Sequence, residues 1–438
     1  MKNSEQLLHD GRIYSLYVLQ HRAIPAASDG LKPAARRVLW TGRDGKKYKT
    51  AVLAGATMPI HPHASPDGTI DTLTGPYNNN IPLFKGYGAF GTMLNPTAYG
   101  ASRYTSVEVS AFTKDVVFKD IEIIPMIENY DSTLMEPAHF LPLIPMAVLN
   151  PNEGIAIGFA CNILPRKLKD IITGQINYLN GKEVDDSAPS FLPLDNTATK
   201  LVAKDLSFRW MFTGTLERIN TYSVKITKLP YGLSHENFTE RLIKLIEEDK
   251  IVDYVDDSKD IIDMTIKFRR GELVNLTDEQ IIKTLGLTNN HTENMNVLDY
   301  SGTKIWSTNY VELIKSFTDW RLTFYSQRYA RLVSLLDKDI SKYNDILLSI
   351  KKNLNKIIKD IANKQELLEV LAEMGIVDVE YVASLPIYRF TAEEKEKTEK
   401  LLTDALALRD NYMGIINSGI KQRDIYIKEL KDVLNKYA

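Results

Sequence analysis

Residues 22–37 read RAIPAASDGLKPAARR and combine a glycine-proline turn with four cations. Pro33 suits the first turn of a helix, so the stretch predicts a loop that leads into a helix over residues 33–41. Arg36 and Arg37 stand just before the apolar residues Val38, Leu39 and Trp40. Fixed arginines of this kind can hold phosphate oxygens in a bidentate fork.

Two shorter strings further along the chain carry complementary chemistry. Residues 61–63 read HPH, and residues 101–105 read ASRYT with Tyr104 near their end. A lone Arg-Tyr pair also fits a buried tyrosine beside an exposed arginine. Together with several cations and an imidazole, however, a phenol suits attack on a phosphodiester whose charged oxygens are held in place.

In order and spacing these three strings resemble the breakage-reunion subunit of type IIA DNA topoisomerases. That family includes the A subunits of gyrase and of topoisomerase IV, and its consensus motifs are close to RALPDxxDGLKPxxRR, YHPHGD and AxxRYTE. The present sequence differs from these consensus motifs at Ile60, Ala64 and Ser106. The resemblance implies that Tyr104 attacks DNA and becomes linked to a 5′ end, while Arg103, Arg22 and His63 steady the charged phosphate.

The same resemblance, with the local charge, predicts a surface that binds duplex DNA. Ile155 matches the family's isoleucine that wedges between base steps and bends the duplex. The other expected DNA contacts come from the following side chains: Lys32, Arg36, Arg37, His61, Lys46 and Lys47. No metal ligand is assigned to this chain, because the two histidines that flank Pro62 have no evident third ligand nearby.

Composition sets wider limits on the chain. The 438 residues are 44% hydrophobic and 25% charged, which is typical of a globular protein with two or three domains. The net charge is -2, yet residues 22–49 hold eight basic and two acidic residues, a local footprint that suits phosphates. The lone Cys161, the lack of an apolar span and the lack of a leader favour a cytoplasmic protein, in the host cytoplasm if it comes from a phage.

We expect an α+β multidomain protein with three parts. The resemblance implies a winged-helix DNA-binding domain with the catalytic tyrosine at residues 1–145 and an α/β tower domain at 146–310, and a coiled-coil arm is expected at 311–438. Apolar spacing and turn residues predict these elements in the first two parts: helices at 4–20, 33–41, 66–74, 165–179 and 236–249, and strands at 103–109, 154–160, 211–217, 222–228 and 261–268.

The arm has the most regular pattern. Apolar residues from Leu336 to Ile361 alternate in steps of four and three, which predicts one helix about 38 Å long with a coiled-coil seam. A second seam is expected at 416–434, with Ile420 and Leu430 among its members. The fold expected is a long antiparallel hairpin with a small helical knob at about 366–395, and the resemblance makes this knob the C-gate through which two copies form a homodimer.

Other features bear on partners and alternatives. A phosphate-binding GxxxxGK[ST] string is absent, so Mg²⁺ and ATP are expected on a partner subunit with metal-binding and ATPase domains. The chain ends just after the arm, which favours a phage-type subunit that relaxes and decatenates DNA.

Three alternatives stay open: a catalytically idle DNA-bending coiled-coil protein, a winged-helix transcription factor, and a dinucleotide enzyme using the GxGxxG string at 86–91. The last is disfavoured because that string lies among asparagines and prolines instead of between a strand and a helix.

Overall fold

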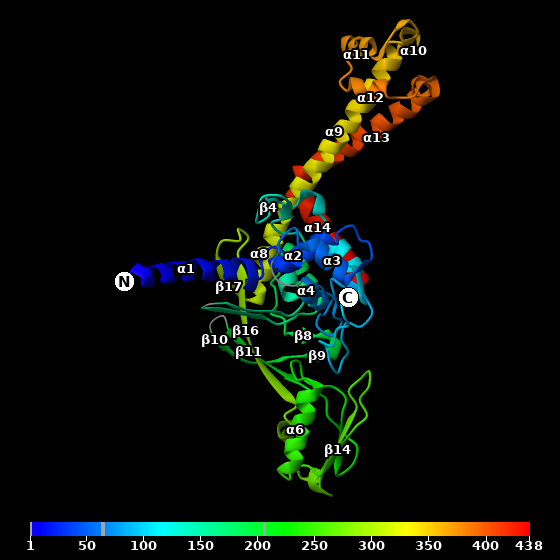
Figure 1. The fold of residues 1–438 in the computed structure, drawn as a ribbon. Helices are drawn as coiled ribbons and strands as arrows, with labels where there is room; N and C mark the ends of the chain where they lie inside the picture. The colour runs from blue at the N-terminus through cyan, green and yellow to red at the C-terminus, as the bar shows by residue number, and fades with distance from the viewer. Residues whose placement is uncertain (1, 63–65, 157, 205–206) are drawn as a thin grey trace. The chain divides into compact units, whose positions relative to one another are not determined.

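The fold is described by a computed structural model that covers residues 2–62, 66–156, 158–204 and 207–438. It divides into two compact units. The first runs to Arg321 and also includes Ile427–Ala438, and the second is Leu322–Tyr426. Helices and strands both contribute (Figure 1), which confirms the mixture of helix and strand that the expected α+β class implies. The winged-helix, tower and coiled-coil assignments stay predictions.

Eight α-helices precede residue 323 in the described part of the chain. They are α1 (Lys2–Val18), α2 (Pro33–Thr41), α3 (Thr50–Thr57), α4 (Pro66–Thr74), α5 (Leu168–Leu179), α6 (His235–Glu247), α7 (Asp278–Leu285) and α8 (Tyr310–Leu322). Short turns of other helix types are η1 (Leu19–Ala23), η2 (Thr113–Val117), η3 (Ile121–Ile123), η4 (Met146–Val148), η5 (Leu192–Leu194) and η6 (Glu272–Val274).

Local chemistry explains several of these boundaries. Pro33 occupies the first turn of α2, as its fixed φ and missing N–H favour. Thr277 and Gln280 form a capping box at the start of α7, and Gly286 ends that helix in the left-handed conformation.

The strands of the first unit form three larger sheets. A three-stranded sheet has the order β1 (Tyr48–Lys49), β3 (Ser106–Val109), β2 (Phe84–Tyr87). A six-stranded sheet has the order β10 (Thr199–Lys204), β11 (Ser207–Thr213), β16 (Thr288–Leu298), β7 (Phe159–Ile163), β6 (Asn152–Ala156), with β17 (Ile305–Thr308) paired to β16. A four-stranded sheet has the order β12 (Glu217–Arg218), β13 (Ser223–Ile226), β15 (Met264–Lys267), β14 (Asp253–Asp256). Two small pairs complete the set: β4 (Met126–Glu128) with β5 (Met135–Pro137), and β8 (Ser190–Phe191) with β9 (Asn196–Thr197).

The four-stranded sheet and helices α6 and α7 bury one apolar cluster. Val224 and Ile226 of β13, Leu242 of α6 and Ile281 of α7 are all fully buried in it. One face of the sheet is therefore covered by amphipathic helices, as the apolar spacing of residues 236–249 predicts.

Close backbone approach fixes the loop of residues 22–37. Gly30 has φ 65°, and a side chain on it would put Cβ 2.2 Å from the backbone nitrogen of Ala147. Only glycine tolerates both the left-handed backbone and this contact. The loop is thereby seated against residues more than a hundred positions later.

The second unit contains two long helices that lie side by side and a group of short ones (Figure 1). Its elements are α9 (Phe324–Lys351), α10 (Leu354–Ile357), η7 (Ile358–Asp360), α11 (Lys364–Glu373), α12 (Val379–Ala383), η8 (Ile387–Phe390) and α13 (Ala392–Ile416). Helix α14 (Gly419–Tyr437) follows and crosses into the first unit. Asp337 pairs with Arg409 and Tyr329 with Tyr412, so α9 and α13 are antiparallel.

Several sequence predictions about strands were wrong in detail. The strand expected at 103–109 begins at Ser106, and residues 102–104 form a turn. The strand expected at 154–160 is a hairpin of β6 and β7, in which Gly158 has φ 82°. Most of the segment 211–217 belongs to β11, which pairs with β10 and β16. It meets the segment 222–228 only at its end, where Glu217 pairs with Lys225 in the short hairpin β12–β13.

Two predictions about the arm were also wrong. The helix expected to reach Ile361 ends at Lys351, because Asn353 adopts φ 56° and starts the separate helix α10. The long helix beside α9 is α13, which ends at Ile416, and Ile420 of the expected second seam is 72% exposed. Within the described residues, no helix combines the length and apolar character needed to cross a membrane.

Candidate active site

Tyr104 stands on a tight turn immediately before strand β3. Its backbone N–H donates to the carbonyl of Ala101 at 2.8 Å, and its side chain is 70% exposed. The guanidinium carbon of Arg103 lies 4.8 Å from the centre of the Tyr104 ring. The turn therefore presents a phenol to solvent with a cation directly beside it.

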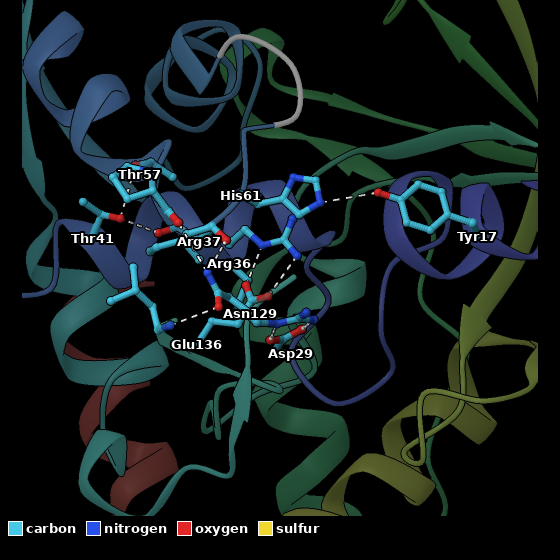
Figure 2. Close-up of polar contacts among 12 residues, drawn as sticks. Tyr17, Asp29, Arg36, Arg37, Thr41, Thr57, His61, Asn129 and Glu136 are labelled. Atoms are coloured by element: carbon cyan, nitrogen blue, oxygen red, sulfur yellow. Dashed lines mark hydrogen bonds and ion pairs between the residues drawn. The ribbon is translucent and has the colours of Figure 1, made fainter. Parts of the chain in front are cut away.

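The Asp-Gly-Leu-Lys-Pro loop is built around a buried carboxylate. Asp29 is fully buried and accepts hydrogen bonds from Arg36 Nε at 2.6 Å and from Arg36 Nη2 at 2.9 Å. The same carboxylate accepts from the backbone N–H groups of Leu31 and Phe140. Since Arg36 is itself only 8% exposed, its guanidinium is engaged within this chain (Figure 2).

Arg37 is engaged in a similar way. Its Nε and Nη2 donate to the two carboxylate oxygens of Glu136 at 2.5 and 3.0 Å (Figure 2). Glu136 belongs to strand β5, 99 residues later in the sequence. The arginine pair thus joins helix α2 to two distant segments, since bidentate guanidinium-carboxylate pairs are among the stronger polar contacts.

Lys32 is turned toward the β6–β7 hairpin. It precedes Pro33 at the start of α2, and its ammonium donates a hydrogen bond to the backbone carbonyl of Glu153. Burial lowers the pKa of Lys32, because the charged form loses hydration. A Cβ on the neighbouring Gly154 would lie 2.0 Å from the carbonyl oxygen of Ala23, so loop and hairpin meet backbone to backbone.

Arg22 lies in the last turn of the short helix η1 and is exposed. Within the described residues its side chain makes no hydrogen bond or ion pair, and no contact joins it to Tyr104. Its guanidinium is therefore open to a ligand, unlike those of Arg36 and Arg37.

The histidine string is described only in part. His61 Nε2 lies 3.4 Å from the hydroxyl of Tyr17 (Figure 2). The His61 ring also meets the ring of Tyr130 edge to face, with 5.4 Å between the ring centres. His63, the histidine expected to touch the scissile phosphate, lies outside the described residues. Asn129 ties the segment before His61 in place through the carbonyls of Pro59 and Ile60.

The remaining expected DNA contacts are on the surface. Lys46 pairs with Asp44 at 3.2 Å and stays largely exposed, and this carboxylate raises the pKa of Lys46 through its hydrogen bond. The ammonium of Lys47 lies 3.6 Å from the centre of the Tyr87 ring. Ile155 is 89% exposed on strand β6, and a large aliphatic side chain is more often buried.

Comparison with known proteins places these features in a family. The family model for the A subunit of DNA gyrase/topoisomerase IV matches residues 22–431. This match covers nearly the whole chain and includes all three motifs.

The chain belongs to this family.

Individual relatives agree with the assignment to the A subunits of gyrase and topoisomerase IV. The DNA topoisomerase medium subunit of Enterobacteria phage T4 is 26% identical over 440 residues, which cover 96% of each protein. The DNA gyrase A subunit of Streptomyces coelicolor is 25% identical, and the match covers 97% of this chain and 54% of that protein. DNA topoisomerase 2-alpha of Gallus gallus is 27% identical, and here the match covers 95% of this chain but 28% of the relative. The chain is therefore a subunit of the type IIA topoisomerase class of enzymes.

A solved structure has the same fold. The DNA-binding, cleavage and re-ligation domain of Plasmodium falciparum topoisomerase II superposes with a TM-score of 0.81 at 23% identity. The superposition covers 97% of this chain and 64% of the other.

In this member of the gyrase/topoisomerase IV family, the structure groups the candidate residues in two ways. Arg103 and Tyr104 lie together on an exposed turn. The other cations are held within the chain: Arg36 binds Asp29, Arg37 binds Glu136, and Lys32 binds the carbonyl of Glu153. Sequence reasoning did not single out Glu136 or Lys49, whose ammonium contacts the Tyr104 carbonyl. Lys49 was visible only as one cation of a basic run, and nothing in the sequence links Glu136 to position 37.

Proposed function

We propose that this chain is the DNA cleavage and resealing subunit of its topoisomerase, with Tyr104 as the nucleophile. The observation that carries the proposal is the exposed Tyr104 ring on its turn with the Arg103 guanidinium beside it. A tyrosine that served only for packing would be buried, whereas a nucleophile must be exposed so that its oxygen can reach a phosphorus atom.

The reaction is a transesterification. The Tyr104 oxygen attacks a backbone phosphorus, a new phosphorus-oxygen bond forms to the 5′ end, and the bond to the 3′ oxygen breaks to leave a free hydroxyl. The phenolic proton leaves during attack and a proton is taken up by the 3′ oxygen. Since one ester replaces another, the reverse reaction reseals the strand without a nucleotide.

Cations beside the phenol serve this step. Negative charge builds up on the non-bridging oxygens during attack, and fixed donors aimed at those oxygens stabilise it. Arg103 is adjacent to the nucleophile, and the exposed Arg22 is available for the same purpose. His63 is assigned to the scissile region from the motif alone.

Duplex DNA binds through surface cations and one wedge. Lys46, Lys47 and His61 contact backbone phosphates. Ile155 enters between base steps, where partial unstacking is repaid by wider contact with bent DNA. Lys32, Arg36 and Arg37 stabilise the segments that form this surface, because their charged groups bind other residues of the chain.

A second polypeptide completes the enzyme. Mg²⁺ and ATP belong to this partner, which supplies the energy for passing one duplex through another in relaxation and decatenation. Among the described residues, no three His, Cys, Asp or Glu side chains are grouped closely enough to hold a metal ion, so no step here is assigned to a metal. The work is done on duplex DNA in the cytoplasm, that of the host if the source is a phage.

Two copies of this chain assemble through the second unit. Val377, Ile387 and Tyr388 of that unit are 78%, 64% and 59% exposed. Exposed apolar side chains of this size favour burial against a partner, and twofold self-association is the commonest arrangement.

One experiment tests the proposal. The chain is mixed with a metal- and ATP-binding subunit of its family, Mg²⁺ and supercoiled plasmid, and the reaction is stopped with detergent and protease. Wild-type chain should give linear DNA, and Tyr104→Phe should give none while still binding the plasmid. Tyr222→Phe, at a half-exposed tyrosine of the same unit, is the matched control. Linear DNA from Tyr104→Phe at the wild-type yield would make another residue the nucleophile, whereas no linear DNA from the wild-type chain would favour the DNA-bending, non-catalytic alternative.

A further inference from the structure

The turn that carries Tyr104 is held by its backbone. Carbonyl groups of the turn accept hydrogen bonds from one short segment at the start of helix α3. The contacts are Ala51 N to Ser102 O at 3.2 Å, Lys49 Nζ to Tyr104 O at 3.3 Å, and Thr50 N to Thr105 O at 3.2 Å. The first turn of a helix has N–H groups without helical partners, and here two of them bind the turn.

A buried hydroxyl pair lies beneath this contact. Thr50 Oγ1 and Thr105 Oγ1 are 2.7 Å apart, and the two residues are 0% and 2% exposed. Strand pairing of Lys49 with Ser106 continues the contact on the other side of the turn. The ends of the turn are therefore rigid, and the residue between them is the exposed tyrosine.

Lys49 differs from its basic neighbours. Lys46 pairs with Asp44, and Lys47 lies over the ring of Tyr87. Lys49 instead directs its ammonium to the carbonyl of the nucleophile's own residue. A charged donor makes a stronger hydrogen bond than a neutral one, so this contact restrains the peptide unit directly attached to the Tyr104 Cα.

We propose that Lys49 is a positioning residue for DNA cleavage, which holds the Tyr104 turn through its carbonyl so that the phenol is aimed at the phosphorus. This inference rests on the proposed role of Tyr104. Lys49 does not bind the scissile phosphate; it acts through the main chain of the residue that attacks it. Its loss therefore slows the chemical step while leaving the binding of DNA intact.

Cleavage under single-turnover conditions, with the partner subunit, Mg²⁺ and saturating duplex, measures that step. Misplacing a reacting group by about 1 Å can slow a reaction on the order of 100-fold, so Lys49→Met should cleave about 10- to 100-fold more slowly. Lys49→Arg keeps a charged donor and should recover most of the rate. Lys338→Met, which removes an exposed lysine of helix α9, should cleave at the wild-type rate.

DNA affinity at several salt concentrations separates positioning from phosphate binding. A positioning role predicts wild-type affinity and an unchanged dependence on salt for Lys49→Met. Weaker binding with the salt slope reduced by about one, and a normal rate at saturating DNA, is the behaviour of a phosphate contact and would overturn the inference. So would an equally slow Lys49→Arg variant, or a wild-type rate for Lys49→Met.

The two proposals fail in different ways. If Tyr104→Phe abolishes the covalent product and Lys49→Met is normal, only the role of Lys49 is refuted. If Tyr104→Phe still forms the product, the nucleophile is another residue and the role of Lys49 falls with it. Thermal unfolding of each variant checks that substitution at the exposed Lys49 leaves the fold intact.

Discussion

Arg166 and Glu293 form a buried bidentate ion pair in the first unit, with nitrogen-oxygen distances of 2.9 and 2.8 Å and about 1% exposure on each side chain. Glu293 lies on the long strand β16 and also accepts from Leu164 N and Trp210 Nε1, both at 2.9 Å. This one carboxylate therefore joins two strands of the six-stranded sheet to the segment that precedes helix α5.

Removal of one partner should destabilise the protein strongly. Arg166→Met leaves a buried carboxylate without its counter-ion, and such changes lower the free energy of unfolding by about 3–5 kcal/mol. Urea titration measures the loss. Lys250→Met, which breaks the surface pair with Glu248, should lower the free energy by less than about 1 kcal/mol. Equal effects of the two variants would contradict the buried role.

Ile155 should matter for DNA shape and not for folding. Because the side chain is 89% exposed, Ile155→Ala should change the free energy of unfolding by less than about 0.5 kcal/mol. Fluorescence energy transfer between the ends of a labelled duplex should report a smaller bend. Ile261→Ala, at another exposed isoleucine, is the control and should bend DNA normally. A full bend with Ile155→Ala would remove the wedge assignment.

Asp71 should make stability depend on pH in an identifiable direction. Burial, followed by the nearby Asp67 charge, raises the pKa of Asp71 to about 6. The folded state favours the protonated carboxyl of Asp71. The stability that Asp71 contributes is therefore fully present below the ordinary pKa of 3.8 and is lost as pH rises through about 6.

Asp71→Asn mimics the protonated form and tests this directly. Thermal unfolding from about pH 4 to pH 7 should show the variant gaining stability over the wild type as pH rises. Asp260→Asn, at an exposed position, should follow the wild-type curve. A constant difference between Asp71→Asn and wild type across this range would refute the coupling.

Asp345 should hold the short helices of the second unit together. It is 2% exposed, and its two carboxylate oxygens accept from the backbone N–H groups of Val377 at 3.0 Å and Asp378 at 2.9 Å. Asp345→Ala should lower the free energy of unfolding by about 1–3 kcal/mol, since it leaves these donors without their acceptor. Hydrogen exchange should accelerate at amides 377 and 378, and exposed Asp339→Ala should leave exchange there unchanged.

The exposed apolar residues of the second unit should control self-association. Ile387→Glu introduces a charge at a side chain that is 64% exposed in the single chain, so the folded chain should persist while the dimer weakens. Sedimentation equilibrium measures the dissociation constant. Ile420→Glu, at an isoleucine that is 72% exposed in the same unit, should leave the dimer intact. An unchanged dimer with Ile387→Glu would place the interface elsewhere, and equal weakening by both variants would show that the effect is not specific to Ile387.

Local signals allowed several elements to be predicted from the sequence. Helix α2 begins at Pro33 and α4 at Pro66, as proline at the first helical turn and polar starting residues indicate. The heptad pattern located α9, but it continued past the end of that helix. Leu354 and Ile357 keep the period because they lie on the next helix and pack into the small apolar cluster around it, so periodicity alone could not reveal the break at Asn353.

The candidate site was less predictable than the motifs suggested. Arg36 and Arg37 were interpreted from charge as DNA contacts, yet their partners Asp29 and Glu136 become apparent only when distant segments meet. The exposure of Tyr104 was likewise expected only from its proposed role as a nucleophile, because the surrounding sequence fits a buried ring equally well. Local composition identifies which residues are special, while tertiary contacts decide which of them face a ligand.

Because the hydrogen bonds at the Tyr104 turn reach main-chain atoms, the scaffold does not depend on which side chain stands at that position. Tyrosine analogues with fluorinated rings could be installed there without disturbing their surroundings. The acidity of the attacking oxygen then becomes a variable that chemists can adjust in steps, separately from the architecture that aims it.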